Sequence, residues 1–199
     1  MKSNTYRTNI AVMSAFTAVL AFAAPQAFAA GSHGGGHDKA MSIGKPGKTA
    51  NVGRTISVVM QDNFYEPENL TVTAGETIRF VIKNTGDLVH EFNIGTAPMH
   101  AAHQKEMAMM VEHGMLEPDK INRDVKMSGM AGMSGKMAMS HNDPNSVLLE
   151  PGKSAEIIWR FEKTTGLEFA CNVPGHYESG MMGKIQIKPL KTSALELGK

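Results

Sequence analysis

The stretch TIRFVIKNTGDLVHEFNI, residues 77–94, contains the pattern on which the fold prediction depends. In its first half every second residue is a large apolar one, namely Ile78, Phe80 and Ile82. A period of two is typical of a β-strand with one buried face. Residues 84–87 then supply turn chemistry, and the alternation resumes from Leu88. The stretch therefore predicts two successive strands joined by a tight turn.

The same pattern extends outward in both directions. Further strands are predicted at residues 55–62, 154–162, 167–171 and 184–188. Turn residues separate the strands at 74–76, 84–87, 151–153 and 164–166. Several short strands with frequent turns and little helix favour an all-β fold, an antiparallel β-sandwich.

The first 29 residues have the features of a cleavable signal peptide. Lys2 and Arg7 precede an apolar run, and Ala27-Phe28-Ala29 forms a small-x-small cleavage site. The run is too short to span a bilayer comfortably, and no other stretch of the sequence could. We therefore expect a protein exported to the periplasm, without a membrane span. Cleavage would take the formal charge from +1 to about −1, which argues against a nucleic-acid partner.

Composition divides the rest of the chain. Residues 30–53 are rich in glycine and poor in large apolar residues, and they predict a flexible tail. Residues 54–190 predict one domain, interrupted by a segment of different composition at 97–145, and residues 191–199 predict a C-terminal tail. A chain of 199 residues suffices for one such domain, which we expect to be monomeric.

Strand parity places two polar side chains inside the predicted sandwich. His90 shares a face with Leu88 and Phe92, and Cys171 shares a face with Phe169, because side chains alternate across a sheet. Taken alone, His90 is well explained as a core histidine that bonds to a backbone carbonyl. The single cysteine of the chain is likewise explained as a small buried hydrophobe.

The segment CNVPGHYESGM, residues 171–181, changes that interpretation. Its proline–glycine pair predicts a tight turn that brings Cys171, His176 and Met181 together. With His90 they provide two imidazoles, one thiolate and one thioether, a set that suits a type 1 copper site able to hold both Cu(I) and Cu(II). Zinc would more often take another cysteine or histidine than a methionine. The partner of the thiol is then a metal and not a second cysteine.

These residues resemble those of the cupredoxins. The Cys-to-His spacing with its PGH triplet is similar to that of azurin and auracyanin, and the His-to-Met spacing to that of plastocyanin and auracyanin. NFYEPENLTVTAGETIRF and NTGDLVHEF are similar to the small cupredoxins encoded with bacterial copper-resistance systems. The resemblance covers about residues 54–96 and 146–190. It implies a Greek-key β-sandwich, with copper held by His90, Cys171, His176 and Met181.

The sequence departs from the family beside the first histidine. The family often has asparagine there, where it helps to tie the ligand loop, and here Glu91 occupies the position. Because groups around the ligands tune a metal centre, the resemblance does not extend to the colour and potential of the site. Met182 follows Met181 directly, and the spacing assigns the axial position to Met181.

Between Thr96 and Asn145 methionine and histidine replace the strand pattern. Residues 99–141 contain ten of the sixteen methionines and four of the eight histidines. Residues 99–113 predict a short helix, for which packing against the sandwich and metal binding are both open interpretations. The later methionines recur among glycines, which disfavour a helix, so copper binding by soft thioethers or a disordered low-complexity segment remain as explanations. The candidate secondary copper ligands are Met99, His100, His103, Met107, Met110, His113, Met127, Met130, Met133, Met137, Met139 and His141.

A closed four-ligand site favours electron transfer and metal handling over catalysis. The sequence lacks the His-x-His pairs of multicopper oxidases and the second cysteine of a dinuclear copper–thiolate centre. We therefore expect a periplasmic copper-handling protein for copper tolerance, and no enzyme beyond weak oxidation of Cu(I). Its expected partners are copper ions and a periplasmic redox or copper-transfer protein. The alternatives are an electron shuttle between redox partners and a metal-free binding sandwich.

Overall fold

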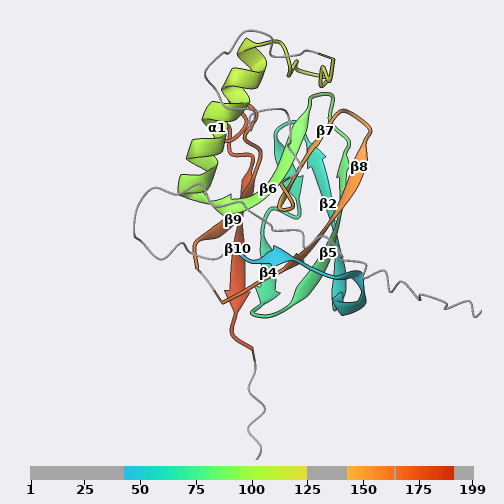
Figure 1. The fold of residues 1–199 in the computed structure, drawn as a ribbon, viewed down its shortest axis with the longest axis vertical. Helices are drawn as coiled ribbons and strands as arrows, with labels where there is room; N and C mark the ends of the chain where they lie inside the picture. Colours follow the sequence, from blue (N-terminus) through green and yellow to red (C-terminus); the bar gives the residue numbers. More distant parts are fainter. Residues whose placement is uncertain (1–42, 125–142, 164, 191–199) are drawn as a thin grey trace, which may run out of the picture. The chain divides into compact units, whose positions relative to one another are not determined.

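The computed structural model describes residues 43–124, 143–163 and 165–190, which form two five-stranded sheets packed as a sandwich (Figure 1). The first sheet has the order β1 (Lys45–Pro46), β8 (Ser154–Arg160), β5 (Thr77–Asn84), β2 (Arg54–Gln61) and β3 (Phe64–Glu66). The second has the order β4 (Leu70–Thr73), β10 (Met182–Lys188), β9 (Leu167–Ala170), β6 (His90–Thr96) and β7 (Ser146–Leu149). The α-helix α1 (Ala97–Glu112) and a 3-10 helix at Thr49–Asn51 complete the elements of these residues.

The predicted sandwich is confirmed, but both of its sheets are mixed. β2 pairs with β5 in parallel, and β4 pairs with β10 in parallel, whereas the other neighbours are antiparallel. The prediction of a wholly antiparallel arrangement is wrong for these two pairs. Alternation along a strand determines which face is buried, and it does not determine which strand lies alongside.

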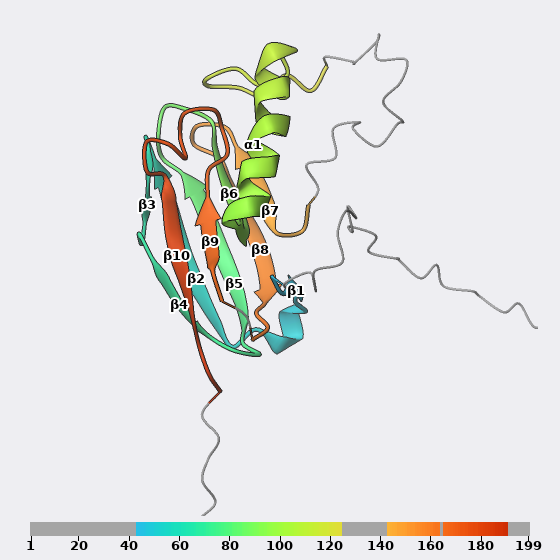
Figure 2. The same ribbon diagram turned by 90° about the vertical axis from the view of Figure 1, so that its left-hand side faces the viewer.

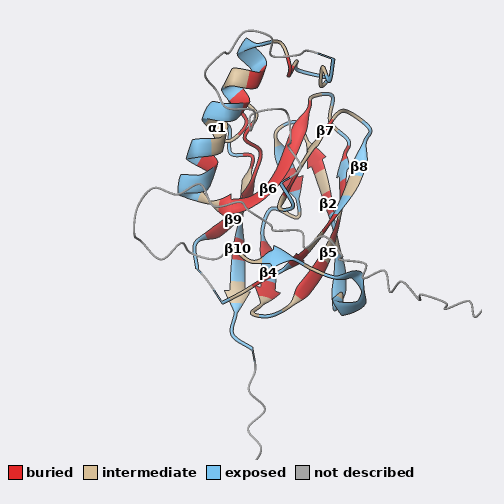
Figure 3. Ribbon diagram, in the orientation of Figure 1, coloured by how far each residue is buried: buried red, intermediate tan, exposed pale blue. Residues whose placement is uncertain are grey.

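The core between the sheets consists of the alternating apolar side chains. Ile78, Phe80 and Ile82 of β5 are fully buried, as the sequence pattern predicts. The ring of Phe92 on β6 lies 5.4 Å from those of both Phe80 and Phe169, measured between centroids. Figure 3 shows buried residues on strands of both sheets. Each such side chain contributes about 1.5–3 kcal/mol by leaving water, so this apolar layer is the main support of the site described below.

Residues 43–53 belong to the folded unit, although their composition predicts a flexible tail. β1 pairs with β8, and the Trp159 indole donates a 3.0 Å hydrogen bond to the carbonyl of Ile43. A Cβ atom at Gly47 would lie 2.5 Å from the Cγ2 atom of Thr77. Glycine therefore permits a close approach of the chain here, and the prediction of flexibility is wrong for this part of the tail.

The helix α1 begins where the predicted Met/His-rich insert begins, and it packs beside β6 and β9 (Figure 2). The predicted helix over residues 99–113 is confirmed. Met107 and Met110 are buried in a small apolar cluster with Val89 and Leu116. The sequence leaves packing and metal binding open for this helix. For these two methionines the structure shows packing.

Several predicted segments lie outside the described residues. They are the signal peptide at 1–29, residues 30–42 of the tail, residues 125–142 of the insert and the C-terminal tail at 191–199. Their assignments stay predictions. Among the helices that the structure does describe, none has the length and apolar character to cross a membrane.

Candidate metal centre

Three of the predicted ligands meet at one end of the sandwich. His90 begins β6, Cys171 directly follows β9, and His176 lies in the loop between β9 and β10. The Nδ1 atoms of the two histidines are 3.2 Å apart. The Cys171 Sγ atom lies 3.4 Å from Nδ1 of His176 and 4.0 Å from Nδ1 of His90. Among the described residues, these three side chains form a group of His, Cys, Asp or Glu whose donor atoms are close enough together to hold one ion.

The spacing of these donors fits a copper ion. Bonds from a borderline-soft metal to imidazole nitrogen and thiolate sulfur are about 2.0–2.3 Å long, so three donors in a plane around it lie roughly 3.5–4 Å apart. The observed separations of 3.2, 3.4 and 4.0 Å lie within about 0.3 Å of this range. Two imidazoles and one thiolate are also the trigonal donor set of type 1 copper. His90, Cys171 and His176 are therefore the residues that would hold the metal.

Met181 is fixed next to these ligands through its backbone. Its N–H donates to the carbonyl of His176 at 2.9 Å, and its carbonyl accepts from the N–H of Cys171 at 3.1 Å. The side chain of Met181 is fully buried, whereas Met182 is only partly buried. This burial favours Met181 over Met182 as the axial ligand, which stays a prediction.

The ligand loop turns at Gly175, as the proline–glycine pair predicts. Gly175 has a φ of 86°, a left-handed conformation that glycine adopts without strain. The N–H of His176 then donates to the carbonyl of Val173 at 3.0 Å. The turn thus brings His176 back toward Cys171, and Figure 2 shows the loop at the upper end of the sandwich.

The protonation states suit a metal site. Burial lowers the pKa of His176 to about 4, and the neighbouring His90 adds to this effect. Burial also lowers the pKa of His90, against the opposing hydrogen bond and charge of Asp62. Both rings are therefore neutral near pH 7 and can offer a lone pair. Burial raises the pKa of the Cys171 thiol to about 12, so a bound cation is what would displace its proton.

Asp62 orients the ring of His90 from the outside. Its Oδ1 lies 2.6 Å from Nε2 of His90, and the carboxylate also accepts the N–H groups of Asp87 at 2.9 Å and Leu88 at 3.2 Å. Because Nε2 carries the proton that it donates to Asp62, Nδ1 keeps its lone pair on the side of Cys171. Sequence reasoning missed Asp62, since an acidic residue in a turn gives no sign of a partner 28 residues away.

Glu91 is a completely buried carboxylate beneath the ligands. Its oxygens accept hydrogen bonds from Ser146 Oγ at 2.6 Å, Asn172 Nδ2 at 2.8 Å and His103 Nε2 at 3.0 Å. Its backbone N–H donates to Cys171 Sγ at 3.3 Å. The residue at the position where the family often has asparagine therefore also ties the ligand loop, through Asn172.

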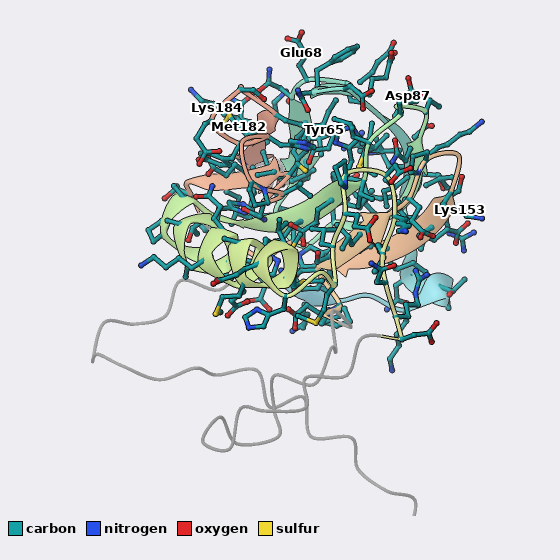
Figure 4. The ribbon with its side chains drawn as sticks, turned by 90° about the horizontal axis from the view of Figure 1, so that it is seen from above. Tyr65, Glu68, Asp87, Lys153, Met182 and Lys184 are labelled. Carbon is teal, nitrogen blue, oxygen red and sulfur yellow. The ribbon has the colours of Figure 1, made fainter. Side chains whose placement is uncertain are left out.

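Tyr65 supports the same residue from the other sheet. Its hydroxyl donates to the carbonyl of Glu91 at 2.5 Å, and both groups are buried. When this end of the molecule is viewed from above, Tyr65 lies between Met182 and Asp87 (Figure 4). Backbone and side chain of Glu91 are thus both held in place.

Glu91 and His103 form a partly buried ion pair. Burial alone would raise the pKa of Glu91, but His103, Ser146 and Asn172 hold it at about 2. Burial would lower the pKa of His103, yet Glu91 and Glu106 raise it to about 9. Both ring nitrogens of His103 face carboxylates, Nδ1 lying 2.8 Å from Glu106 Oε2. An imidazolium that donates at both nitrogens has no lone pair for copper, which argues against His103 as a secondary ligand.

Among the described residues, the other candidate histidines belong to no group of three His, Cys, Asp or Glu side chains close enough to hold one ion. His100 is buried, Met99 is exposed, and His113 Nδ1 lies 2.7 Å from the carbonyl of Met109. Met107 and Met110 are the packed methionines of α1. Met127, Met130, Met133, Met137, Met139 and His141 lie outside the described residues.

Comparison with known proteins agrees with this geometry. The cupredoxin-like domain family matches residues 13–97, which include His90 and end at the start of α1. Auracyanin B is similar in structure, with a TM-score of 0.50 and 18% sequence identity, over 73% of this chain and 96% of that chain. At this identity the likeness shows the fold alone.

Two relatives are more similar in sequence. The copper-resistant cuproprotein CopI of Pseudomonas aeruginosa is 50% identical over 161 residues, which cover 74% of this chain and 83% of that protein. The copper-resistant cuproprotein CopI of Rubrivivax gelatinosus is 39% identical over 160 residues, covering 80% of each chain. Both alignments are longer than the segment of residues 13–97 that the domain family matches. The chain therefore belongs to the CopI family of cupredoxin-like proteins.

Proposed function

We propose that this protein is a periplasmic type 1 copper protein that binds copper and contributes to copper tolerance. The observation that carries the proposal is the meeting of His90 Nδ1, His176 Nδ1 and Cys171 Sγ within 4.0 Å of one another. The relatives from Pseudomonas aeruginosa and Rubrivivax gelatinosus, named as copper-resistant cuproproteins, support copper tolerance as the role. Bound copper would supply one-electron exchange between Cu(I) and Cu(II).

The residues of the chain would bind and orient the ligands and keep water away. Asp62 keeps the proton of His90 on Nε2, and the Glu91 N–H donates to the Cys171 sulfur. Full burial of His90 and Cys171 limits access of water to the donors. With Met181 as a fourth ligand no coordination position would stay open for a substrate, so we propose no catalytic activity.

We also propose a second copper-binding region in the Met/His-rich insert, located after α1. The support is that other contacts engage several of the candidate ligands on α1. Met107 and Met110 on α1 are packed, and His103 is engaged by two carboxylates. The candidate ligands that lie after α1 are Met127, Met130, Met133, Met137, Met139 and His141.

Copper titration of the mature protein tests the main proposal. The wild type is expected to bind one copper with an intense thiolate-to-copper absorption band in the visible range. The Cys171→Ser variant keeps the size of the side chain and is expected to lose that band. A wild type loaded with Cu(II) that lacks the band would overturn the proposal.

A second titration tests the insert. Replacing the five methionines between residues 127 and 139 by serine should preserve the coloured copper and remove additional Cu(I) equivalents. The matched control replaces Met99, an exposed methionine of α1, and should leave the stoichiometry unchanged. An unchanged stoichiometry in the five-methionine variant would reject the second region.

An electron shuttle between periplasmic redox partners is the second candidate function. His176 is 9% exposed, whereas His90 and Cys171 are 0% exposed, so its ring offers an edge through which an electron could leave. Rapid electron exchange with a periplasmic cytochrome, together with unchanged copper tolerance after loss of the gene, would favour this role.

A further inference from the structure

We propose that His103 of α1 is a positioning residue of the copper centre, acting through the buried carboxylate of Glu91. The inference rests on the proposed copper site. It makes the first helix of the Met/His-rich insert a part of that site, and not a part of a separate copper reservoir.

The contacts of His103 determine its chemistry. Nε2 lies 3.0 Å from Glu91 Oε1, and Nδ1 lies 2.8 Å from Glu106 Oε2. Ionised carboxylates only accept hydrogen bonds, so the ring donates at both nitrogens and carries a positive charge. Its side chain is only 12% exposed, so water screens this charge weakly.

His103 provides the charge that Glu91 requires. Glu91 is fully buried, and an ionised carboxylate without a cationic partner is costly in such a place. Its other side-chain partners are the neutral groups of Asn93, Ser146 and Asn172. Among the described contacts of this carboxylate, the positive charge comes from the insert and not from the sandwich.

Glu91 connects this charge to the ligands along two routes. It directly follows His90 in β6, and its N–H donates to the Cys171 sulfur at 3.3 Å. Its Oε2 accepts from both Nδ2 and the backbone N–H of Asn172, the residue after Cys171, at 2.8 and 3.3 Å. Hydrogen bonding around the cysteine sulfur is one of the features that tune the potential of a type 1 site. A change at His103 should therefore be measurable at the copper.

The sign of the effect follows from charge. Without His103 the Glu91 anion is uncompensated near the copper, and it favours Cu(II) over Cu(I). Without the Glu91 anion the positive charge of His103 is uncompensated, and it favours Cu(I) over Cu(II). A unit charge about 10 Å away in a medium of effective dielectric constant about 20 changes an equilibrium by about tenfold. For a one-electron couple this corresponds to about 59 mV.

The experiment measures the reduction potential and the charge-transfer band of copper-loaded His103→Gln. We expect the preference for Cu(II) over Cu(I) to rise about tenfold and the band to shift. The matched control is His113→Gln, which replaces an exposed histidine just after the same helix. We expect the control to keep the wild-type potential and band. Identical values for the two variants would overturn the inference.

Two further variants decide the question if His103→Gln does not fold. Glu91→Gln keeps the shape of the side chain and removes the anion, so the preference for Cu(II) should fall about tenfold. The double variant removes both charges and should return toward the wild-type potential. The two single variants would then shift the potential in opposite directions, and the shifts would cancel in the double variant. A purely structural role of His103 would not produce this coupling. A wild-type potential in Glu91→Gln would reject the inference, whereas a colourless wild type would reject the proposed copper site itself.

Discussion

Nε2 of His90 lies 2.6 Å from Oδ1 of Asp62, so a carboxylate from the turn after β2 holds the first ligand of the site. The same carboxylate accepts the backbone N–H groups of Asp87 and Leu88, just before β6. One side chain therefore fixes both the loop that leads to His90 and the orientation of its ring. Carboxylate partners of this kind raise the basicity of a metal-binding histidine.

We predict that Asp62→Asn weakens copper binding while the protein remains folded. The amide oxygen still accepts from Nε2 of His90, but the negative charge is lost. Removing an outer partner of a ligand typically costs about 10–100-fold in metal affinity, and Asp62 is partly exposed, so we expect about tenfold for Cu(II). Competition with a chelator of known affinity measures this change.

The control for this prediction is Asp87→Asn. Asp87 lies in the loop that leads to His90 and is exposed, and it contacts Asp62 through its backbone N–H, which the substitution preserves. Its affinity should equal that of the wild type. Equal affinities for the two variants would show that the Asp62 charge has no part in binding.

The ion pair of Glu91 and His103 predicts how the stability of the copper-free protein depends on pH. The pKa of Glu91 falls from 4.5 to about 2, so its contribution is complete above pH 4.5 and is lost as the pH falls toward 2. The pKa of His103 rises from 6.5 to about 9, so its contribution is complete below pH 6.5 and is lost as the pH rises toward 9. The pair should therefore stabilise the fold most between about pH 4.5 and 6.5.

Urea unfolding at a series of pH values measures this dependence. Both pKa shifts describe the same ion pair, so its contribution to the free energy of unfolding is counted once. We expect it to be on the order of 2–3 kcal/mol. His103→Gln should lose the decline in the free energy of unfolding between pH 6.5 and 9. His113→Gln should retain it. A decline of the same size in both variants would assign it to other groups.

We predict that Met181→Leu keeps the copper and raises the reduction potential. Leucine replaces methionine at similar volume, so the cost to the fully buried position should stay below about 1.5 kcal/mol. Loss of a thioether donor disfavours Cu(II), the more highly charged state, and the axial ligand tunes the potential. Redox titration with Met182→Leu as control distinguishes the two methionines. A shift in Met182→Leu alone would transfer the axial role to that residue.

The sequence predicts the inward faces of the strands and the ligands, because both depend on local pattern. Alternation places Phe80 and His90 inside, and a short spacing with one turn brings Cys171 to His176. The roles of Asp62 and His103 depend instead on packing between separate elements. Helical periodicity predicts that His103 shares a face with Met107, but the identity of its partner follows from how α1 lies on the sheet.

Met107 provides the last prediction, because packing and copper binding make opposite demands on it. Its side chain is fully buried in the cluster with Val89, Met115 and Leu116. If packing is its role, Met107→Leu should change the free energy of unfolding by less than about 1.5 kcal/mol and leave all copper equivalents in place. Met107→Ala should cost about 2–5 kcal/mol through the cavity it creates, again with unchanged copper binding. Urea unfolding and Cu(I) titration of the same samples measure both quantities. Loss of one Cu(I) equivalent in Met107→Leu, with stability intact, would instead identify Met107 as a ligand and move part of the second copper region onto α1.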